Sequence, residues 1–444
     1  MPFVGTSATA RGSATGPAQG MRYVCAMTTS THVASVAAAE PIFENDFGSV
    51  TVVDADSLPI LERLSMKRIV LEPGTLREPQ WNVNANQLAY CVSGTVLVSI
   101  LGNADAFSSF LVTAGQMYHV ESGAVYNIEN VGEQRAQLIL ALRHERPRHF
   151  SLRASFNAMT DAVLGNTYDL PAAAFAAFDR ASSAQVVRRS GPADIPSTAG
   201  LPNAHLFDLE GQLAPLSYAY GEARLARMQF WAALEDISMY NLRVKESGMR
   251  EPHWHPVTAE MGYVDRGHAR MRILDPDGSL DEYELNPGDV YFVPRAYPHH
   301  IEVLGSDDIN FLIFFDQPMP GDIGYRATAS AFSREVLAAS FDVAERDLPQ
   351  FPYTGRPAHR QPAQPARSRD LSTARARLRR PLVDRAPRGP RWGTRPARPQ
   401  RARRARRPPA RRSGPGGPRR AGSRAPPAAI RRTGSRRTSG SSRT

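Results

Sequence analysis

Short runs of bulky apolar residues recur along the chain, and turn-forming residues separate them. Tyr240–Val244, Ala269–Leu274 and Phe311–Phe315 are such runs, in which apolar side chains alternate or cluster, and Asp275–Gly278 is a typical break between them. Many short strands at regular spacing, punctuated by Gly, Pro and Asp, are typical of a β-sandwich or a β-barrel. The pattern therefore predicts an all-β fold. Two segments, Ala154–Leu164 and Ala331–Ser340, have helix-like sequences instead, and we expect short helices there that flank the β-structure.

The chain contains an internal repeat. The segment REPQWNVNANQLAYCVSG begins at Arg77, and it returns as REPHWHPVTAEMGYVDRG at Arg250, an offset of 173 residues. The same offset aligns Gly94 with Gly267, and no gap is needed over about fifty residues. A register of this length indicates that the chain holds two copies of one domain.

Length and composition agree with two domains. The 444 residues and the 42% apolar content leave room for two cores of ordinary size, which we place at 41–190 and 191–354. Residues 1–40, rich in Ala, Ser, Thr and Gly, are predicted to be a disordered extension. No run of eighteen apolar residues occurs, so we expect no membrane association. The two cysteines, Cys25 and Cys91, cannot build a disulfide framework and fit a reducing cytoplasm.

The net charge of +11 comes from the C-terminal end of the chain. Residues 355–444 contain 28 arginines, two aspartates and neither lysine nor glutamate, so the rest of the chain is acidic. This Arg/Pro-rich tail has almost nothing to bury and is predicted to be disordered. Such a tail could bind nucleic acid through counterion release. We favour a tail that is not native or has no function, because the composition breaks abruptly after Thr354, as in a GC-rich gene read out of frame.

Four residues of the second copy have the spacing of a metal site. His253 and His255 are two positions apart, which puts both imidazoles on one face of a strand. Glu260 follows a bend at Pro256, and His299 follows a Pro-Gly-Asp turn. Three imidazoles and one carboxylate suit Mn(II) or Fe(II) and leave two positions for substrate or dioxygen. A closed zinc site, or polar residues without any ion, are the alternatives.

The first copy lacks all four of these residues. The equivalent positions are Gln80, Asn82, Gln87 and Tyr126. Amides and a phenol can hold one another by hydrogen bonds, but they are poor ligands for a transition metal. The first domain is therefore predicted to be free of metal, and the whole chain to bind one ion. His119 does not stand at a ligand position.

The second copy, GMREPHWHPVTAEMGYVDRG followed by PGDVYFVPRAYPHHIEV, closely resembles the two motifs of the cupins. The arginine three residues before the first histidine resembles the oxalate decarboxylase and germin-like members of that family. The resemblance covers roughly residues 42–350 and implies two tandem cupin barrels, that is, double-stranded β-helices or jelly rolls, with short flanking helices. It also implies Mn²⁺, or alternatively Fe²⁺, as cofactor, a small carboxylic acid such as oxalate as substrate, and a homo-oligomer.

The resemblance suggests catalytic roles for three further residues. Arg250 would hold the carboxylate of the substrate beside the metal, although its twin Arg77 in the first copy leaves a purely structural role open. The family carries a proton donor on a lid that follows the second motif, but the stretch FFDQPMPGDIGYR has no matching glutamate. Asp322 and Glu302 are the nearest candidates for this acid.

Three functions remain open on the sequence. The first is an oxalate decarboxylase-like carboxy-lyase, which we favour, with an oxalate oxidase as a close variant. The second is an Fe- or Mn-dependent dioxygenase acting on a larger substrate, and the third is a non-catalytic bicupin that binds a metal or a small acid. A carboxyl group beside the open metal positions would favour the lyase, an apolar cavity the dioxygenase, and a filled pocket the binding protein.

Overall fold

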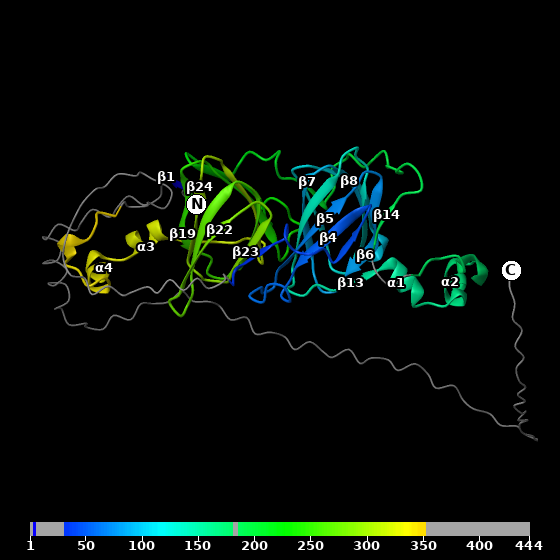
Figure 1. The fold of residues 1–444 in the computed structure, drawn as a ribbon, viewed down its shortest axis with the longest axis horizontal. Coiled ribbons are helices and arrows are strands. Elements are labelled where there is room, and N and C mark those ends of the chain that lie inside the picture. The colour runs from blue at the N-terminus through cyan, green and yellow to red at the C-terminus, as the bar shows by residue number, and fades with distance from the viewer. Residues whose placement is uncertain (1–2, 6–30, 181–184, 352–444) are drawn as a thin grey trace, which may run out of the picture. The chain divides into compact units, whose positions relative to one another are not determined.

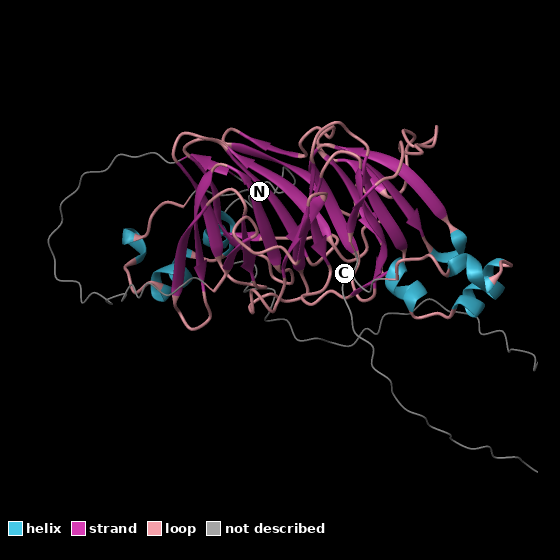
Figure 2. Cartoon of the chain, turned by 45° about the vertical axis from the view of Figure 1, so that its right-hand side comes forward, coloured by secondary structure: helices cyan, strands magenta, loops and turns pink. Residues whose placement is uncertain are grey.

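The computed structural model describes residues 3–5, 31–180 and 185–351, and these form two β-barrels (Figure 1). Figure 2 shows that strands make up most of this part of the chain and that the helices lie outside the barrels. The predicted all-β fold is therefore confirmed. Each barrel consists of two antiparallel sheets, one of seven strands and one of six.

The first barrel is built mainly from residues 43–188. Its seven-stranded sheet contains β15 (Leu206–Asp208), β10 (Gln116–Val120), β7 (Gln87–Ser93), β12 (Ala136–Leu142), β5 (Ser65–Leu71), β4 (Gly48–Val53) and β3 (Phe43–Asn45). Its six-stranded sheet contains β13 (His149–Ser151), β6 (Thr75–Asn82), β11 (Val125–Asn130), β8 (Thr95–Leu101), β9 (Phe107–Thr113) and β14 (Val186–Arg188).

The second barrel repeats this plan. Its seven-stranded sheet contains β16 (Leu216–Tyr218), β17 (Gly221–Ala226), β18 (Ser238–Val244), β25 (Ile309–Phe315), β20 (Glu260–Arg266), β23 (Asp289–Val293) and β2 (Val33–Ser35). Its six-stranded sheet contains β1 (Phe3–Gly5), β19 (Gly248–Trp254), β24 (His299–Leu304), β21 (His268–Leu274), β22 (Leu280–Leu285) and β26 (Ile323–Gly324).

Short helices follow each barrel, as predicted, but each predicted helix is interrupted. The helices are α1 (Leu152–Asn157), α2 (Asp161–Tyr168), α3 (Tyr325–Ala331) and α4 (Arg334–Ser340), with 3₁₀ turns at Asn103–Asp105, Ala172–Phe175 and Glu345–Asp347. The hydroxyl of Thr160 accepts from the backbone of Val163, and Ser333 does the same for Val336. These side chains cap the starts of α2 and α4, because they satisfy backbone N–H groups that have no partner inside the helix. None of the helices in the described ranges has the length and apolar character of a membrane crossing.

Each repeat lends a strand to the other barrel. Val33–Ser35 pairs with β23 of the second barrel, and Leu206–Asp208, which lies 173 residues later, pairs with β10 of the first. The predicted boundary between 190 and 191 therefore does not separate the barrels in space. The prediction that residues 1–40 are disordered is also wrong for β2 and for Phe3–Gly5, which pairs with β19. Residues 6–30 and the predicted tail at 355–444 lie outside the described residues.

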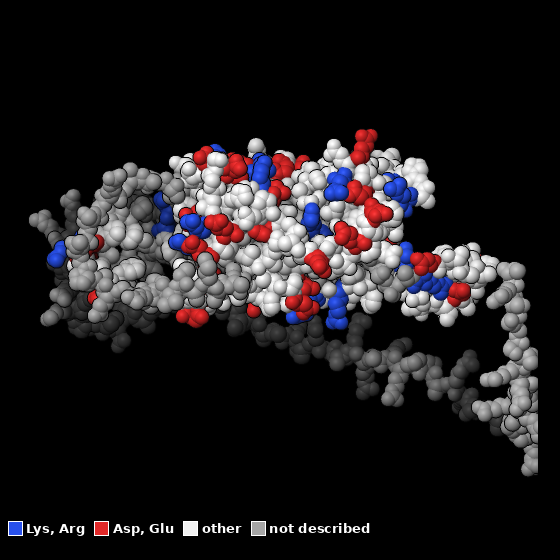
Figure 3. Space-filling model, viewed as in Figure 1, with Lys and Arg blue, Asp and Glu red and all other residues white. Residues whose placement is uncertain are grey.

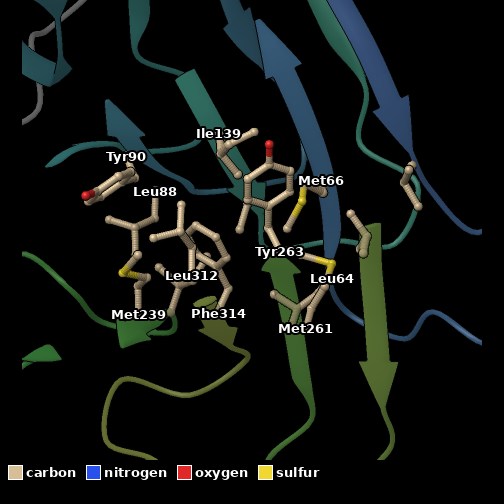
Figure 4. Close-up of a cluster of buried hydrophobic side chains, with 14 of the residues drawn as sticks. Leu64, Met66, Leu88, Tyr90, Ile139, Met239, Met261, Tyr263, Leu312 and Phe314 are labelled. Carbon is tan, nitrogen blue, oxygen red and sulfur yellow. The ribbon is translucent and has the colours of Figure 1, made fainter. Parts of the chain in front are cut away.

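The central strands are apolar on both faces because each face is covered. In β25, Phe311, Ile313 and Phe315 point into the second barrel, whereas Leu312 and Phe314 join a cluster between the barrels. Figure 4 shows this cluster, in which Met66 and Leu88 of the first barrel pack with Met239 and Met261 of the second. A strand that is buried on both sides reads as an unbroken apolar run, and INFLIFF is such a run. On the face shown in Figure 3, acidic and basic side chains are interspersed.

Candidate metal centre

The structure brings the four predicted ligand residues together inside the second barrel. His253 on β19 lies opposite His299, the first residue of β24, while Glu260 opens β20 after the bend that follows His255. One potential ligand atom from each side chain lies within 4.8 Å of the others, and all four residues are at most 3% exposed. Residues 46 positions apart in the sequence meet here because antiparallel pairing joins the two strands.

The three imidazoles are oriented by the backbone. Each Nδ1 lies at hydrogen-bond distance from a carbonyl oxygen, which can only accept, so each Nδ1 carries a proton. The pairs are His253 with Glu251 at 2.8 Å, His255 with Gly321 at 2.8 Å, and His299 with Tyr297 at 2.9 Å. The Nε2 atom of each ring then carries no proton, and its lone pair is available to a metal ion. Histidine ligands of metals in proteins are commonly fixed in this way.

The carboxylate of Glu260 completes a set of acceptors. Its Oε2 lies 2.9 Å from His255 Nε2 and 3.5 Å from His299 Nε2, while its Oε1 accepts a hydrogen bond of 2.7 Å from the hydroxyl of Tyr291. Two ligands about 2.1 Å from one ion and at right angles to each other are about 3.0 Å apart, so these separations suit coordination. His299 Nε2 is buried and has no hydrogen-bond partner among the described residues.

The protonation states favour a cation at the centre. Burial would raise the pKa of Glu260, but positive charge and hydrogen-bond donation from the side of His299 and His255 outweigh it and hold the pKa well below its ordinary value, and a metal ion between the same rings would act in the same direction. Burial, and then the nearby His299 ring, lower the pKa of His253 far below its ordinary value, so that ring is neutral. An ionised carboxylate and imidazole lone pairs, buried together, leave acceptors without donors. Such a set is costly unless a metal ion fills it, and the residues present therefore fit a divalent metal.

The space between these residues is small. A cavity of about 10 Å³ is lined by the following residues: Tyr240, Leu242, Arg250, His253, His255, Glu260, Ile301, Ile313 and Phe315. A volume of this size corresponds to roughly one water-sized species. An ion fits into this space without any rearrangement, whereas a substrate requires neighbouring residues to move.

Residues 320–322 contact three of the residues that line the cavity. The carbonyl of Pro320 accepts from the hydroxyl of Tyr240 at 3.4 Å, and the carbonyl of Gly321 holds His255. Asp322 forms an ion pair with Arg250, whose side chain is 3% exposed, while that of Asp322 is 27% exposed. The structure thus brings two of the three predicted catalytic residues, Arg250 and Asp322, together at the edge of the site.

Glu302 does not reach the cavity, and its predicted role as an acid there is wrong. It lies on β24, where His299 and Ile301 face inward and the intervening residues face outward. Its carboxylate pairs with His300 at 3.0 Å on the outer face of that strand. The physical reason is the two-residue period of a β-strand, which sends the third residue after His299 to the opposite side.

In the first barrel, the four replacement residues form a hydrogen-bonded chain. Gln80 Nε2 donates to the hydroxyl of Tyr126 at 3.2 Å, and this hydroxyl donates to Gln87 Oε1 at 2.8 Å. Asn82 Nδ2 donates to the same Gln87 oxygen at 3.4 Å. The predicted hydrogen bonds among the amides and the phenol are therefore present, although Asn82 Oδ1 and Gln87 Nε2 have no partner among the described residues.

Sequence reasoning missed some features around the sites. Tyr291, which orients Glu260, stands in the motif PGDVYFV, and strand alternation could have placed it inside the barrel. The ring of Tyr291 packs directly on Gly262. A Cβ atom at position 262 would lie 2.1 Å from the Cε1 atom of this ring, so only glycine fits here. Two further groups of potential ligands lie outside both barrel pockets: His119, Glu121 and His205, and His32, Asp275 and Asp281.

Comparison with known proteins identifies the family. The cupin family model matches residues 34–174 and 231–348, and the chain belongs to the cupin family. It is 25% identical over 313 residues to the oxalate decarboxylase OxdC of Bacillus subtilis, and this alignment covers 67% of this chain and 79% of that protein. A probable oxalate decarboxylase of Arthroderma benhamiae is 21% identical over 301 residues, 64% of this chain and 72% of that protein.

Other relatives are shorter matches or structures. A cruciferin of Raphanus sativus is 27% identical over 152 residues, 34% of this chain and 29% of that protein. The structure of oxalate decarboxylase from Bacillus subtilis at pH 4.6 superposes with a TM-score of 0.65 at 22% identity, covering 72% of this chain and 85% of that chain. The predicted fold of two tandem cupin barrels and the resemblance to oxalate decarboxylases and germin-like proteins are therefore confirmed.

Proposed function

We propose that this chain is a metal-dependent enzyme of the oxalate decarboxylase type, which acts on oxalate or a similar small carboxylic acid at one site in the second barrel. The observation that carries the proposal is the convergence of His253, His255, Glu260 and His299, with their lone pairs turned inward, beside the buried guanidinium of Arg250. We infer Mn²⁺ as the metal, with Fe²⁺ as the alternative, because this mixed set of imidazoles and a carboxylate suits both. A cytoplasmic homo-oligomer remains part of the proposal.

The side chains would divide the work as follows. The bound ion would supply Lewis acid and redox chemistry to a coordinated oxygen of the substrate. Arg250 would bind the other carboxylate of the substrate through its planar guanidinium. That carboxylate would take the place of Asp322 in the ion pair. Conversion of oxalate to formate and carbon dioxide consumes one proton. Asp322, released from Arg250 and partly open to solvent, is the group that could deliver it.

The alternatives differ in what they require of the cavity. A cavity of about 10 Å³ admits no substrate without rearrangement, and the dioxygenase, with its larger substrate, requires the larger opening. An oxalate oxidase needs the same substrate contacts but no protonation of carbon, since dioxygen takes up the two electrons and, with two protons, leaves as hydrogen peroxide. A non-catalytic binding protein finds support in the partial similarity to cruciferin. The buried guanidinium of Arg250, which lines the same cavity as the candidate ligands, favours an enzyme that acts on small acids over a binding protein.

Metal analysis and product assays test the proposal. We expect one Mn or Fe per chain after purification, and formate with carbon dioxide from oxalate. Peroxide with two molecules of carbon dioxide would identify the oxidase, and no turnover of any small acid by metal-loaded protein would overturn the enzymatic proposal. Glu260→Gln should lose the metal on dialysis against a mild chelator, because it removes the single anionic ligand from a buried site. Glu302→Gln, on the outer face of the same barrel, is the matched control and should keep it.

A further inference from the structure

The interior of the first barrel differs in charge from that of the second. The offset of 173 residues is kept in the strand pairing: Trp81 faces Phe150 across β6 and β13, as Trp254 faces Ile323 across β19 and β26. The positions around the two pockets can therefore be compared one by one. Lys67, Arg77, Gln87 and His149 of the first barrel correspond to Tyr240, Arg250, Glu260 and Asp322 of the second.

Compared with the second pocket, the first pocket has lost two carboxylates and gained an amine. The second pocket has one cation, Arg250, and two carboxylates, Glu260 and Asp322. The first pocket keeps the guanidinium as Arg77, gains the amine of Lys67, and has neither carboxylate. Arg77 is 2% exposed and Lys67 is 5% exposed, so both cations are shielded from water.

Within the described residues, neither cation of the first barrel forms an ion pair with a carboxylate, although the charges of Asp54 and Glu78 act on Lys67 and Arg77 respectively. Arg77 donates from Nη2 to Gln80 Oε1 at 3.0 Å, but its Nε and Nη1 have no hydrogen-bond partner. The nearest carboxylate on the same strand, that of Glu78, forms an ion pair with Arg153 at 3.0 Å and accepts from the backbone of Gln185. Glu78 attracts Arg77 without a hydrogen bond to it, and a buried guanidinium with unpaired N–H groups is costly.

Further donors in this pocket are also free. Tyr118 occupies the position of Tyr291, but its hydroxyl has lost the glutamate to which it would donate and has no partner among the described residues. Gln87 Nε2 is likewise buried without a partner. Two cations, a hydroxyl and an amide N–H thus share one interior, which is suited to an acceptor with negative charge.

We propose that the first barrel is a metal-free binding site for one small carboxylate anion, held by Arg77 and Lys67. The guanidinium fork fits both oxygens of a carboxylate, and the ammonium adds a second charge. The anion must be small, because core residues such as Ile69, Ile128 and Leu140 fill the same interior. This site does not depend on the metal or on the reaction proposed for the second barrel.

The state of Lys67 agrees with a missing counter-ion. Burial, followed by the charge of Arg77, lowers the pKa of Lys67 from 10.5 to about 7. An anion between the two side chains would stabilise the protonated amine and raise this pKa again. The barrel would then hold its ligand most tightly where the amine is charged.

Titration calorimetry on the full-length protein, stripped of metal by a chelator, tests the proposal. Sodium oxalate and sodium formate are titrated at constant ionic strength, with sulfate and chloride as inorganic anions. We expect one carboxylate per chain, and at least tenfold weaker binding for Lys67→Met. Lys67→Arg, which keeps the charge, should retain binding, and Glu302→Gln, on the outer face of the second barrel, should leave it unchanged.

Three other results would contradict the proposed anion site in the first barrel. Loss of binding in Arg250→Gln with full binding in Lys67→Met would put the anion in the second barrel. Equal binding of sulfate, chloride and carboxylates would remove the carboxylate specificity. If Lys67→Met does not fold, Lys67→Arg and thermal denaturation of the wild type decide: a melting temperature that rises equally with oxalate and sulfate would contradict the proposed site.

Discussion

The buried amine of Lys67 should make the stability of this protein depend on pH in an unusual direction. Burial and the charge of Arg77 lower its pKa to about 7 in the folded chain, whereas the unfolded chain keeps the ordinary value of 10.5. Between these two pH values the unfolded chain binds the proton and the folded chain does not. The free energy of unfolding therefore rises with pH across this window, and the contribution is lost as the pH falls through 7.

The size of the effect follows from the same two values. A pKa difference of about 3.5 corresponds to about 5 kcal/mol over the full window, and to about 3 kcal/mol between pH 6 and pH 9.5. Lys67→Met replaces lysine by an unbranched side chain one atom shorter and removes the titration. We therefore expect the free energy of unfolding of the wild type, relative to Lys67→Met, to increase by about 3 kcal/mol from pH 6 to pH 9.5.

Urea denaturation at pH 6, 8 and 9.5, in buffers free of carboxylates, measures this difference. Lys245→Met is the control, because the side chain of Lys245 is exposed. Parallel pH profiles for the wild type and Lys67→Met would show that the amine is not buried in an uncompensated state. That result would remove the physical basis for the anion site as well.

Three further predictions concern the second barrel and the tail. Arg250→Lys should lower kcat/KM for oxalate by about a hundredfold with little loss of bound metal, because lysine keeps the charge but loses the planar guanidinium that orients the substrate. Arg77→Lys is the control and measures what the same exchange costs in stability. Equal stability losses in the two variants, without a kinetic effect of Arg250→Lys, would show that Arg250 is structural. Tyr291→Phe should weaken metal retention about tenfold in a chelator competition, since Glu260 loses the hydroxyl that orients it, and unchanged retention would contradict that role. Removal of residues 355–444 should leave the melting temperature and any activity unchanged, and aggregation of the shortened chain would show that the boundary is misplaced.

The sequence by itself determined the repeat, the all-β fold and the set of residues that meet at the candidate metal centre. The reason is that strand geometry is periodic: two residues separated by one position share a face, and a repeat without gaps carries every position of one barrel onto the other. The same alternation, applied from His299, would have excluded Glu302. The four ligand positions were predictable because one motif fixes them, although their binding of a metal stays a prediction.

Tertiary structure decided the contacts between segments that no local pattern links. The exchange of β2 and β15 between the barrels, the ion pair of Arg250 with Asp322, and the hydroxyl of Tyr291 on Glu260 all join residues far apart in the sequence. Periodicity can show which face a side chain takes, but it cannot show what lies opposite. The buried position of Lys67 is the clearest case, because a lysine in a strand is expected at the surface. Only the closed barrel shows that it is buried near Arg77 and forms no ion pair within the described residues.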